Sequence, residues 1–484
     1  MSIIKTVDKI RSGELSSREL LEKYLPLIEA GQEKLNSYVP PLLSEKARLA
    51  ADRLDERIKA GGGEKIGRLA GIPVAIKDNM LLEGTATTCG SNILKNYNSP
   101  YTATAVQKII DEGAVIVGKT NMDEFAMGSS GETSYFGPVK NPADINRIPG
   151  GSSSGSAAVV ADKHVFASLG SDTGGSIRQP AAMCGVVGMK PTYGLVSRYG
   201  LVAFASSLDQ IGPFALNVED AALILEVIAG YDPKDSTSYN PENYADEKTL
   251  DIVSGVNDGV NGLKFGIPKE YLLDGLDPEI RSRLEETAGI LVKAGAEVQE
   301  VSLPLTKYAV AVYYIVAPAE ASANLARYDG VKYGLRTGNG KDLMEDYLKT
   351  RQEGFGSEVK RRIMLGTYAL SSGYYDAYYL KAQKVRNLMK ADFENVFSQV
   401  DMILSPTTPT TAFKIGEKTE DPLTMYLSDI YTISSNLVGI PAISIPAGTD
   451  SKGLPIGIQF MAPLLEDRRL FTAGRVIEGT YPNE

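Results

Sequence analysis

The amino-acid sequence predicts an α/β protein, because short apolar strands alternate along the chain with longer amphipathic helices. The clearest example is residues 263–301, where strand-like runs at 263–267 and 296–301 flank a helix near 278–294, as in a βαβ unit. A second example is the helical segment 103–112, which is followed at once by the strand-like run 114–117. Other short apolar runs that we expect to be strands lie at 71–79, 402–404, 440–445 and 456–460.

The first 60 residues are expected to form an N-terminal helical part. Residues Ser16 to Glu19 match a capping box, in which two side chains satisfy free backbone N–H groups at the start of a helix. Behind the box, apolar side chains recur with helical spacing, at Leu20, Leu21, Tyr24, Leu25 and Ile28.

Two later segments have distinctive compositions. Residues 231–262 are polar and rich in Asp, Asn, Ser and Gly, so we expect an exposed excursion there. Residues 374–379 place aromatic side chains four positions apart on a helix, for which packing in the core is the usual arrangement. We find no internal repeat and expect residues 1–484 to form a single domain.

Composition indicates a large enzyme without a disulfide framework. With 484 residues, 43% of them hydrophobic, the chain can bury a substantial core. No stretch approaches the roughly 20 apolar residues that span a membrane, and the segment after Met1 lacks the pattern of a secretory signal. Two cysteines, Cys89 and Cys184, are too few for a metal cluster, so we expect a cytoplasmic protein without a metal site. The net charge of −10 makes the chain alone a poor nucleic-acid binder, because such binding depends on neutralising phosphates.

Glycine and serine are concentrated in two neighbouring segments, PGGSSSGS at 149–156 and TGGSIRQP at 173–180. Glycines let backbone N–H groups approach a ligand, and a serine among them can be surrounded by hydrogen-bond donors. A nucleophile with an oxyanion hole requires this arrangement. A histidine base would have to be His164, the only histidine in the chain, so we expect another group to activate the serine.

Lys77 is the candidate base, because it ends the apolar run at 71–79. A lysine that a buried strand carries into the interior is desolvated, which lowers its pKa from about 10.4 toward neutrality. The neutral amine can then accept a proton. A strand-end lysine that extends its amine to solvent is the alternative for this motif taken alone.

The three motifs together resemble the amidase signature family. They occur in order at 71–79, 150–156 and 171–180, with Ser152 75 positions after Lys77 and Ser176 24 positions after Ser152. The resemblance implies a mixed sheet wrapped by helices and a Ser-cisSer-Lys triad. In this triad Ser176 is the nucleophile, Ser152 is the bridging hydroxyl on a cis Gly151–Ser152 bond, and Lys77 is the base. The implied oxyanion hole consists of the backbone N–H groups of Thr173, Gly174, Gly175 and Ser176.

Several polar residues near these motifs have structural alternatives. The hydroxyls expected to cap the helix predicted at 157–161 are those of Ser153, Ser154 and Ser156. Asp172 and Arg178 could contact substrate, or form a buried ion pair that holds the nucleophile loop. Cys184 is expected to be a small buried apolar side chain rather than a nucleophile.

The segment GAVIVGKT at 113–120 matches the phosphate-binding pattern GxxxxGK[ST] letter for letter. A P-loop follows a strand and opens a helix, whereas here a helix ending at a glycine precedes a spacer typical of a strand. We therefore expect Lys119 to lie in a strand and the segment not to bind ATP.

Within the family, nearly the whole chain resembles the glutaminase subunits of tRNA-dependent amidotransferases. The segments that carry this resemblance are 121–128, 354–367, 371–375 and 421–426. It implies a γ-glutamyl acyl-enzyme, with Arg362 and Asp429 holding the α-carboxylate and α-amino groups of glutamine and Tyr313 lining the pocket. A solvent-facing Arg362 paired with a helix carboxylate is the alternative.

The resemblance also implies partners. Ammonia would pass to a kinase-like B subunit, which would amidate Glu-tRNA(Gln) or Asp-tRNA(Asn), hold the ATP and magnesium, and supply most of the tRNA contacts. A small C subunit would brace the heterotrimer, and this chain would need no cofactor of its own. The alternative function is a free-standing amidase acting on aryl, fatty-acyl or other small amides, which needs the triad but not Arg362 and Asp429.

Overall fold

The structure, a computed structural model, describes residues 2–62, 66–240, 242, 247–272 and 275–481. In the described part of the chain, 11 strands form one sheet in the order β1-β3-β2-β4-β6-β5-β10-β11-β9-β7-β8. Strand β2 pairs in parallel with β3 and β4, and β7 pairs in parallel with β8 and β9. The other neighbours are antiparallel. The predicted α/β class and the mixed sheet are therefore confirmed.

The strands are short and most are fully buried. Their bounds are β1 Tyr38–Val39, β2 Pro73–Lys77, β3 Val115–Thr120, β4 Ala167–Asp172, β5 Val187–Lys190, β6 Gln210–Ala215, β7 Lys264–Pro268, β8 Glu297–Val301, β9 Met402–Pro406, β10 Ala442–Thr449 and β11 Pro455–Met461.

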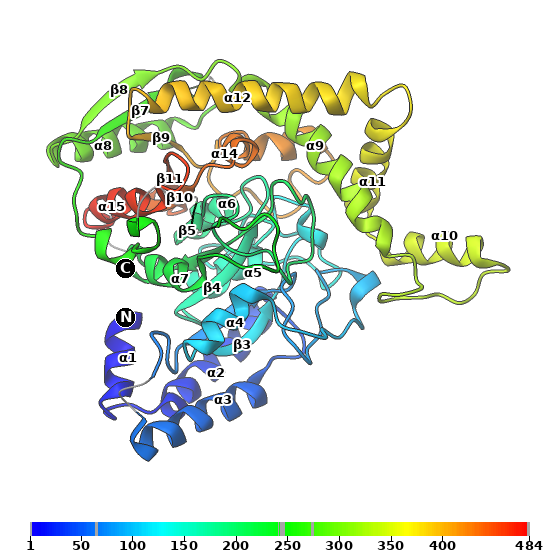
Figure 1. Cartoon of the computed structure of the whole chain (residues 1–484), viewed down its shortest axis with the longest axis horizontal. Helices are drawn as coiled ribbons and strands as arrows, with labels where there is room; N and C mark the ends of the chain where they lie inside the picture. The colour runs from blue at the N-terminus through cyan, green and yellow to red at the C-terminus, as the bar shows by residue number, and fades with distance from the viewer. Residues whose placement is uncertain (1, 63–65, 241, 243–246, 273–274, 482–484) are drawn as a thin grey trace.

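Helices cover both faces of this sheet and both of its ends (Figure 1). Helices α5 and α6 pack on one face, and α7, α8 and α15 pack on the other. Helices α1 to α3 lie at one end, α9, α11 and α12 lie at the other, and α10 extends away from the body (Figure 1). Their bounds are α1 Ile3–Arg11, α2 Ser17–Leu35, α3 Ser44–Arg57, α4 Thr104–Asp111, α5 Ser154–Ala161, α6 Arg178–Cys184, α7 Val218–Ile228, α8 Pro278–Lys293, α9 Ala309–Asn324, α10 Leu343–Gly354, α11 Ser357–Leu370, α12 Lys381–Phe397, α13 Pro422–Tyr426, α14 Ile433–Val438 and α15 Asp467–Glu478.

The alternation of side chains along β2 sets the position of the candidate base. Val74 and Ile76 belong to the largest core cluster, which also contains the buried side of α7. Ala75 belongs to a different cluster, formed with the apolar side chains of α5. Because alternate residues of a strand point to the same face, Lys77 points like Ala75 toward α5 and the serine-rich segment that precedes it.

Most of the predicted elements are present. The capping box at the start of α2 is confirmed, with Ser16 N–H donating to Glu19 Oε2 at 2.9 Å and Glu19 N–H donating to Ser16 Oγ at 3.0 Å. The predicted βαβ unit is confirmed as β7, α8 and β8, whose two strands are parallel. The other runs expected to be strands correspond to β2, β3, β9, β10 and β11, and the helix expected at 103–112 is α4.

The segment 231–262 is only partly an exposed excursion. Tyr231 is exposed, but Ile252, Val256 and Val260 are buried in the largest core cluster. Apolar side chains four positions apart let this stretch lie against the body despite its polar composition. The expectation of exposure is therefore wrong for these residues, while 241 and 243–246 lie outside the described residues.

The tyrosines at 374–379 do not pack into the core as expected. Tyr374, Tyr375 and Tyr378 are each at least 40% exposed, and the ring of Tyr374 lies 4.3 Å from that of Tyr368 on α11. Helix α11 ends at Leu370, Gly373 with φ of 88° lies in the turn that follows, and residues Asp376–Leu380 form a π-helical turn. The spacing of four residues therefore does not produce a stripe that faces the core.

The phosphate-loop lookalike is a strand, as predicted. All of it after Ala114, residues Val115–Thr120, forms β3, and Lys119 is 3% exposed. The Lys119 Nζ lies 3.0 Å from Asp78 Oδ1 and donates to Thr87 Oγ1 at 3.0 Å. The amine is thus committed to a buried ion pair within the fold.

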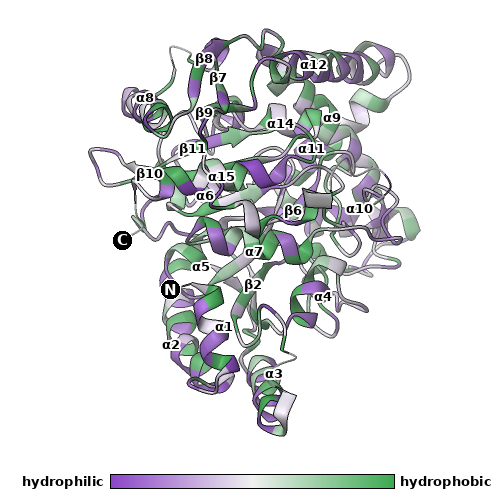
Figure 2. Cartoon of the chain, turned by 60° about the vertical axis from the view of Figure 1, so that its left-hand side comes forward, coloured by the Kyte–Doolittle hydropathy of each residue, from purple (hydrophilic) through white to green (hydrophobic). Residues whose placement is uncertain are grey.

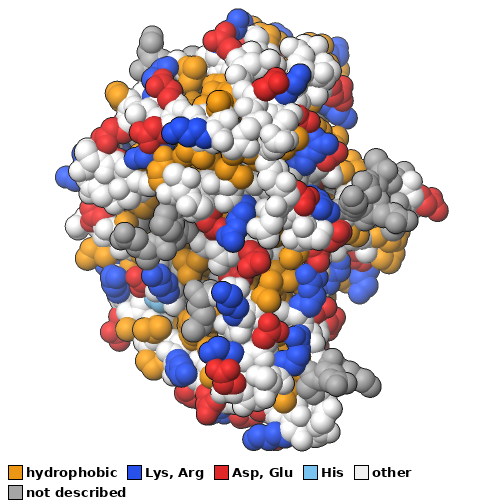
Figure 3. All heavy atoms as spheres, turned by 90° about the vertical axis from the view of Figure 1, so that its left-hand side faces the viewer, with side chains coloured by type: hydrophobic (Ala, Val, Ile, Leu, Met, Phe, Trp, Pro, Cys, Tyr) orange, Lys and Arg blue, Asp and Glu red, His pale blue; other side chains and the backbone are white. Residues whose placement is uncertain are grey.

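The outer surface is mixed in character. Helix α12, on the outside of the molecule, alternates between hydrophilic and hydrophobic residues along its length (Figure 2), and it buries Ala382, Met389, Phe393 and Val396. Figure 3 shows acidic and basic side chains interspersed over one face. None of the helices among the described residues is both long and apolar enough to cross a membrane.

The Lys119–Asp78 pair leads to a first prediction. We expect Lys119→Met to lower the free energy of unfolding by about 3–5 kcal/mol, because it leaves Asp78 buried without its counter-charge. Chemical denaturation of both proteins measures this change. The double variant Lys119→Met/Asp78→Asn removes the unpaired charge, so we expect it to recover much of the loss. Nucleotide binding by the wild-type chain that disappears in Lys119→Met would contradict the structural role.

Candidate active site

The candidate base, Lys77, lies at the end of β2 in a socket of hydroxyl groups. Its Nζ lies 2.7 Å from the Oγ of Ser152 and 2.9 Å from the Oγ of both Ser153 and Ser171. The carbonyl oxygen of Ser171 lies at 3.3 Å, and Asn79 Nδ2 donates to the Ser171 hydroxyl at 2.9 Å. The side chain is fully buried, so the alternative of a solvent-extended lysine is wrong.

Burial lowers the pKa of Lys77 from its ordinary 10.5 to about 7, although the carboxylates of Asp123, Asp172 and Asp209 act in the opposite direction. None of these carboxylates forms an ion pair with Lys77 in the described structure, so desolvation of the ammonium outweighs their attraction. A lysine with this pKa is neutral in a large fraction of molecules at physiological pH. It can therefore act as a general base there.

The candidate nucleophile, Ser176, lies on the loop between β4 and α6. This loop follows the carboxylate of Asp172, which accepts the N–H of Gly175 at 2.8 Å and that of Ile177 at 3.1 Å. The N–H of Ser153 donates to the carbonyl of Ser176 at 3.2 Å, which joins the loop to the segment that carries Ser152. The Gly151–Ser152 bond is cis, as the resemblance implied.

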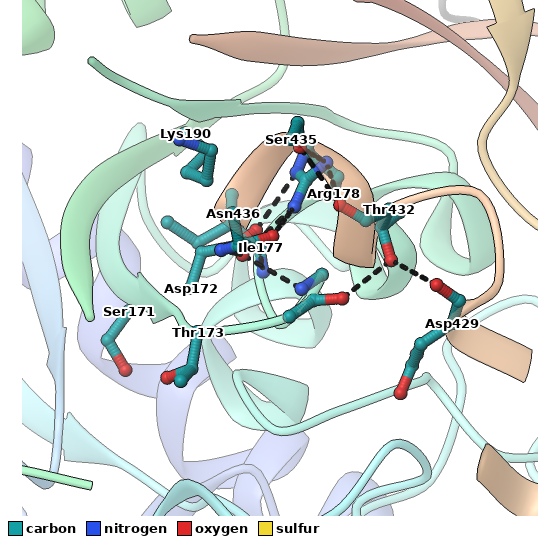
Figure 4. Close-up of polar contacts among 12 residues, drawn as sticks. Ser171, Asp172, Thr173, Ile177, Arg178, Lys190, Asp429, Thr432, Ser435 and Asn436 are labelled. Carbon is teal, nitrogen blue, oxygen red and sulfur yellow. Dashed lines mark hydrogen bonds and ion pairs between the residues drawn. The ribbon is translucent and has the colours of Figure 1, made fainter. Parts of the chain in front are cut away.

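A buried ion pair fixes this loop from behind. Arg178 donates to both carboxylate oxygens of Asp172 at 3.1 Å, and neither side chain is exposed (Figure 4). The remaining guanidinium contacts are with Thr432 O, Ser435 Oγ, Asn436 Oδ1 and Gln459 Oε1. Burial alone would raise the pKa of Asp172, but the Arg178 charge outweighs it and lowers the pKa to about 2. The buried ion pair that was the structural alternative for Asp172 and Arg178 is therefore present.

The geometry changes one detail of the implied oxyanion hole. The N–H of Gly175 is already donated to Asp172, so it is not free to hold an oxyanion. The N–H groups of Gly174 and Ser176 form no hydrogen bond with the residues that the structure describes. With Thr173 beside them, they are the candidate donors. Gly175 has φ of 138°, a conformation that glycine adopts readily and that lets the loop turn here.

A cavity of about 470 Å³ lies on the α11 side of this loop. It is lined by Ser129, Arg362 and Tyr426, among others, and by the N-terminal turn of α11. Arg362 is 3% exposed, so the alternative of a solvent-facing arginine is wrong. The helix carboxylate that this alternative expected is nevertheless present as Glu358, whose Oε1 lies 2.8 Å from Arg362 Nε. The two terminal nitrogens of Arg362 form no hydrogen bond with any residue that the structure describes. They are therefore available to an anion in the cavity.

The other two predicted substrate residues lie close to Arg362. Asp429 is buried behind Ser129, whose hydroxyl donates to it. Burial raises the pKa of Asp429 to about 7, although the bond from Ser129 and the charge of Arg362 both lower it. Tyr313 is 5% exposed and packs on the nucleophile loop, because a Cβ placed on Gly174 would lie 2.7 Å from its ring. The structure thus brings Tyr313, Arg362 and Asp429 together, although they are distant in sequence.

Sequence reasoning missed part of the socket around the base. Ser153 precedes α5 but its side chain caps no N–H; it accepts a bond from Lys77 and donates to the Ser171 carbonyl at 3.0 Å. Ser171 and Asn79 lie inside the motifs at 171–180 and 71–79, but the sequence alone assigns them no role. Ser154 and Ser156 bond to backbone carbonyls instead of capping N–H groups, at Asn121 and Leu169.

The two alternative catalytic residues, His164 as a base and Cys184 as a nucleophile, form contacts outside the triad. His164 bonds through Nε2 to Asp162 at 2.9 Å and stacks on Tyr38. Burial raises the pKa of the Cys184 thiol, and the sulfur lies 3.3 Å from the carbonyl of Pro149. Both are structural, as expected.

Comparison with known proteins agrees with this geometry. The sequence model of the Amidase family matches residues 19–471. The chain is 56% identical over 478 residues to the A subunit of the glutamyl-tRNA(Gln) amidotransferase of Syntrophus aciditrophicus, covering 99% of this chain and 96% of that protein. It is equally similar, with the same coverage, to the protein of that name from Carboxydothermus hydrogenoformans.

Solved structures extend the comparison to the fold. The crystal structure of the A subunit of glutamyl-tRNA(Gln) amidotransferase from Thermotoga maritima superposes with a TM-score of 0.81 at 45% identity, covering 100% of this chain and 96% of that chain. A bacterial aryl acylamidase of the amidase signature family superposes with a TM-score of 0.86 at 26% identity, covering 100% and 96%. On its motifs, its fold and these matches over nearly its full length, the chain belongs to the amidase signature family.

Proposed function

We propose that the chain is the glutamine-hydrolysing subunit of a tRNA-dependent amidotransferase, which supplies ammonia for converting Glu-tRNA(Gln) to Gln-tRNA(Gln). The observation that carries this proposal is the pair Arg362 and Asp429, two buried and opposite charges beside one cavity. A free amino acid has a carboxylate and an ammonium that must both be desolvated on binding, and opposite charges in the pocket offset that cost. The relatives named as the A subunit of this amidotransferase support the assignment.

The socket around Lys77 orients its lone pair. A neutral amine has two N–H groups and one lone pair, and three hydroxyls surround the Nζ. Ser153 gives its own proton to the Ser171 carbonyl, so its oxygen accepts from Lys77. Ser171 Oγ accepts from Asn79 with one lone pair and has a second lone pair for Lys77. With the two amine protons on these serines, the lone pair faces the hydroxyl of Ser152.

Proton transfer then follows one route. Ser176 attacks the side-chain amide carbon of glutamine while its proton passes to Ser152 and the Ser152 proton passes to Lys77. The free N–H groups of the nucleophile loop stabilise the oxyanion. The same route returns the proton to the departing nitrogen, which leaves as ammonia, and water then releases glutamate from the acyl-enzyme. These steps use side chains and backbone of this chain only.

The complete reaction requires partners. Activation of the tRNA-linked glutamate consumes ATP and magnesium, which we assign to a kinase-like B subunit together with most of the tRNA contacts. A small C subunit completes the proposed heterotrimer, and the same assembly could use Asp-tRNA(Asn). A net charge of −10 on this chain is consistent with tRNA binding elsewhere in the complex.

The alternative is a free-standing amidase of the aryl acylamidase kind, which shares the fold. It would use Lys77, Ser152 and Ser176 in the same way. It would have no use for a buried arginine that lines the cavity and whose terminal nitrogens form no hydrogen bond with any described residue. That arginine therefore favours the glutaminase.

The triad makes one prediction. Ser176→Ala, Ser152→Ala and Lys77→Ala should each lower the glutaminase rate by about a thousandfold or more, and double variants should lose little beyond that, because the three groups act as one unit. Lys77→Arg should be as damaging, since a guanidinium is not a base near neutrality. Ammonia release by the full complex measures these rates. Wild-type turnover by Ser176→Ala or Lys77→Arg would exclude the triad.

The pH dependence of glutamine hydrolysis gives a further prediction. Burial lowers the pKa of Lys77 to about 7 and raises that of Asp429 to about 7, and both groups must be deprotonated to act on glutamine. As pH falls below about 7, log kcat/KM should therefore drop with a slope approaching about two for glutamine but about one for a neutral amide. In Asp429→Asn the slope for glutamine should fall to that of the neutral amide. Equal slopes for both substrates in the wild type would contradict the role of Asp429.

Discrimination between glutamine and a neutral amide gives another prediction. Arg362→Ala should lower kcat/KM for glutamine by an amount equivalent to about 2–5 kcal/mol, because it leaves the substrate carboxylate without its partner. Asp429→Ala should weaken glutamine binding through the amino group. Hydrolysis of a small uncharged amide should stay near the wild-type rate in both, because neither residue contacts the triad. If kcat/KM falls equally for both substrates, these residues support the fold. If kcat/KM falls for neither substrate, the free-standing amidase gains support.

A further inference from the structure

The buried side chain of Gln179 lies between the substrate-recognition residues and the triad. It is the second residue of α6, three positions after Ser176, and it is fully buried. Its Oε1 accepts the N–H of Gly151 at 2.8 Å, and its Nε2 donates to the carbonyl of Ser129 at 2.7 Å. Both ends of one amide are therefore used, each on a different segment of the active site.

Each of these two contacts leads to a functional group. Gly151 is the residue before Ser152, whose hydroxyl lies 2.7 Å from Lys77. Ser129 lines the cavity, and its hydroxyl donates to Asp429. Buried hydrogen bonds thus link Asp429, Ser129, Gln179 and Gly151, and the peptide bond of Gly151 leads directly to the bridging serine.

There is little room for this contact to shift. A Cβ placed on Gly150, which has φ of 82°, would lie 2.7 Å from the Gln179 Oε1. The backbone N–H of Gln179 also donates to the carbonyl of Gly175 at 2.8 Å, which ties the same residue to the nucleophile loop. On the other side of Asp429, Thr432 joins the carbonyls of Asp429 and Gly174 through its hydroxyl at 3.1 and 2.7 Å (Figure 4).

We propose that Gln179 is a positioning residue for both sides of the active site: its amide nitrogen positions Ser129 beside Asp429, and its amide oxygen positions Gly151 and so Ser152. This inference rests on the proposed glutaminase function, because it assigns Asp429 to the amino group. Gln179 itself contacts neither the catalytic side chains nor the cavity. Its two contacts act separately, since the carbonyl oxygen of the amide supports the triad and the amide nitrogen supports the recognition side.

Two substitutions separate these contacts. In Gln179→Glu the carboxylate still accepts the Gly151 N–H, but in its ionised form it has no proton to donate to the Ser129 carbonyl; because burial raises the pKa of a carboxyl, the comparison is made over a pH series up to about 9. In Gln179→Met, which has a similar length, both hydrogen bonds are lost. A matched control is Gln210→Glu, because Gln210 is also buried and accepts a glycine N–H, that of Gly194, at 2.9 Å while donating to the carbonyl of Val196 at 3.3 Å.

The experiment measures kcat and KM for glutamine and for a small neutral amide, with the full-length chain in complex with its partner subunits. We expect Gln179→Glu to raise KM for glutamine about tenfold and to leave kcat/KM for the neutral amide within about threefold of the wild type, as for loss of one buried hydrogen bond. Gln179→Met should lower kcat/KM about tenfold or more for both substrates. Gln210→Glu should change neither substrate preference nor KM.

The outcomes that overturn the inference are distinct from those that overturn the proposed function. If Gln179→Glu changes kcat/KM by the same factor for both substrates, or for neither, or if Gln210→Glu raises KM for glutamine equally, Gln179 does not position the recognition side separately from the triad. If the wild-type complex hydrolyses the neutral amide but not glutamine, the glutaminase function fails and the inference fails with it. A Gln179→Met protein that does not fold leaves the Gln179→Glu comparison to decide.

Discussion

The site depends on one physical constraint, which is that Lys77 is buried without a carboxylate in contact with it. Desolvation disfavours the ammonium, and three serine hydroxyls satisfy the neutral amine without neutralising a charge. A carboxylate in contact with Nζ would raise the pKa again and remove the base. The position of the strand end, the serine-rich segment before α5 and the Ser171 hydroxyl all follow from this requirement.

The ion pair behind the nucleophile loop is fully satisfied. Asp172 and Arg178 satisfy each other and the surrounding amides, and their ion pair holds the nucleophile loop through the N–H groups of Gly175 and Ile177. Removing either partner alone would leave an unpaired buried charge and destabilise the loop. On the recognition side the pairing is incomplete at Arg362, which lines the cavity and whose terminal nitrogens form no hydrogen bond with any described residue. A ligand anion would complete it.

Sequence predicted the local elements well, because each depends on periodicity, caps and turns that are close together in the chain. The capping box at Ser16, the βαβ unit at 263–301 and the strand at Lys119 are examples. The triad positions follow from the resemblance to a family whose three motifs occur at fixed spacing. Gln179 lay inside such a motif, but its partners, Gly151 and Ser129, are brought to it only by the fold, so no spacing predicts its role. The exposed tyrosines at 374–379 show the opposite failure, in which a helical spacing was present but α11 had already ended at Leu370.

The most direct test of this mechanism is the pKa of the Lys77 amine, measured from the carbon-13 shift of its ε-methylene group as pH is varied. Lys190, whose pKa burial also lowers to about 7, makes comparison with Lys77→Met necessary to assign the signal. Desolvation of the amine predicts that the assigned signal titrates with a midpoint of about 7. A midpoint near the ordinary value of 10.5 would mean that Lys77 is charged at neutral pH, and it would contradict its role as the base.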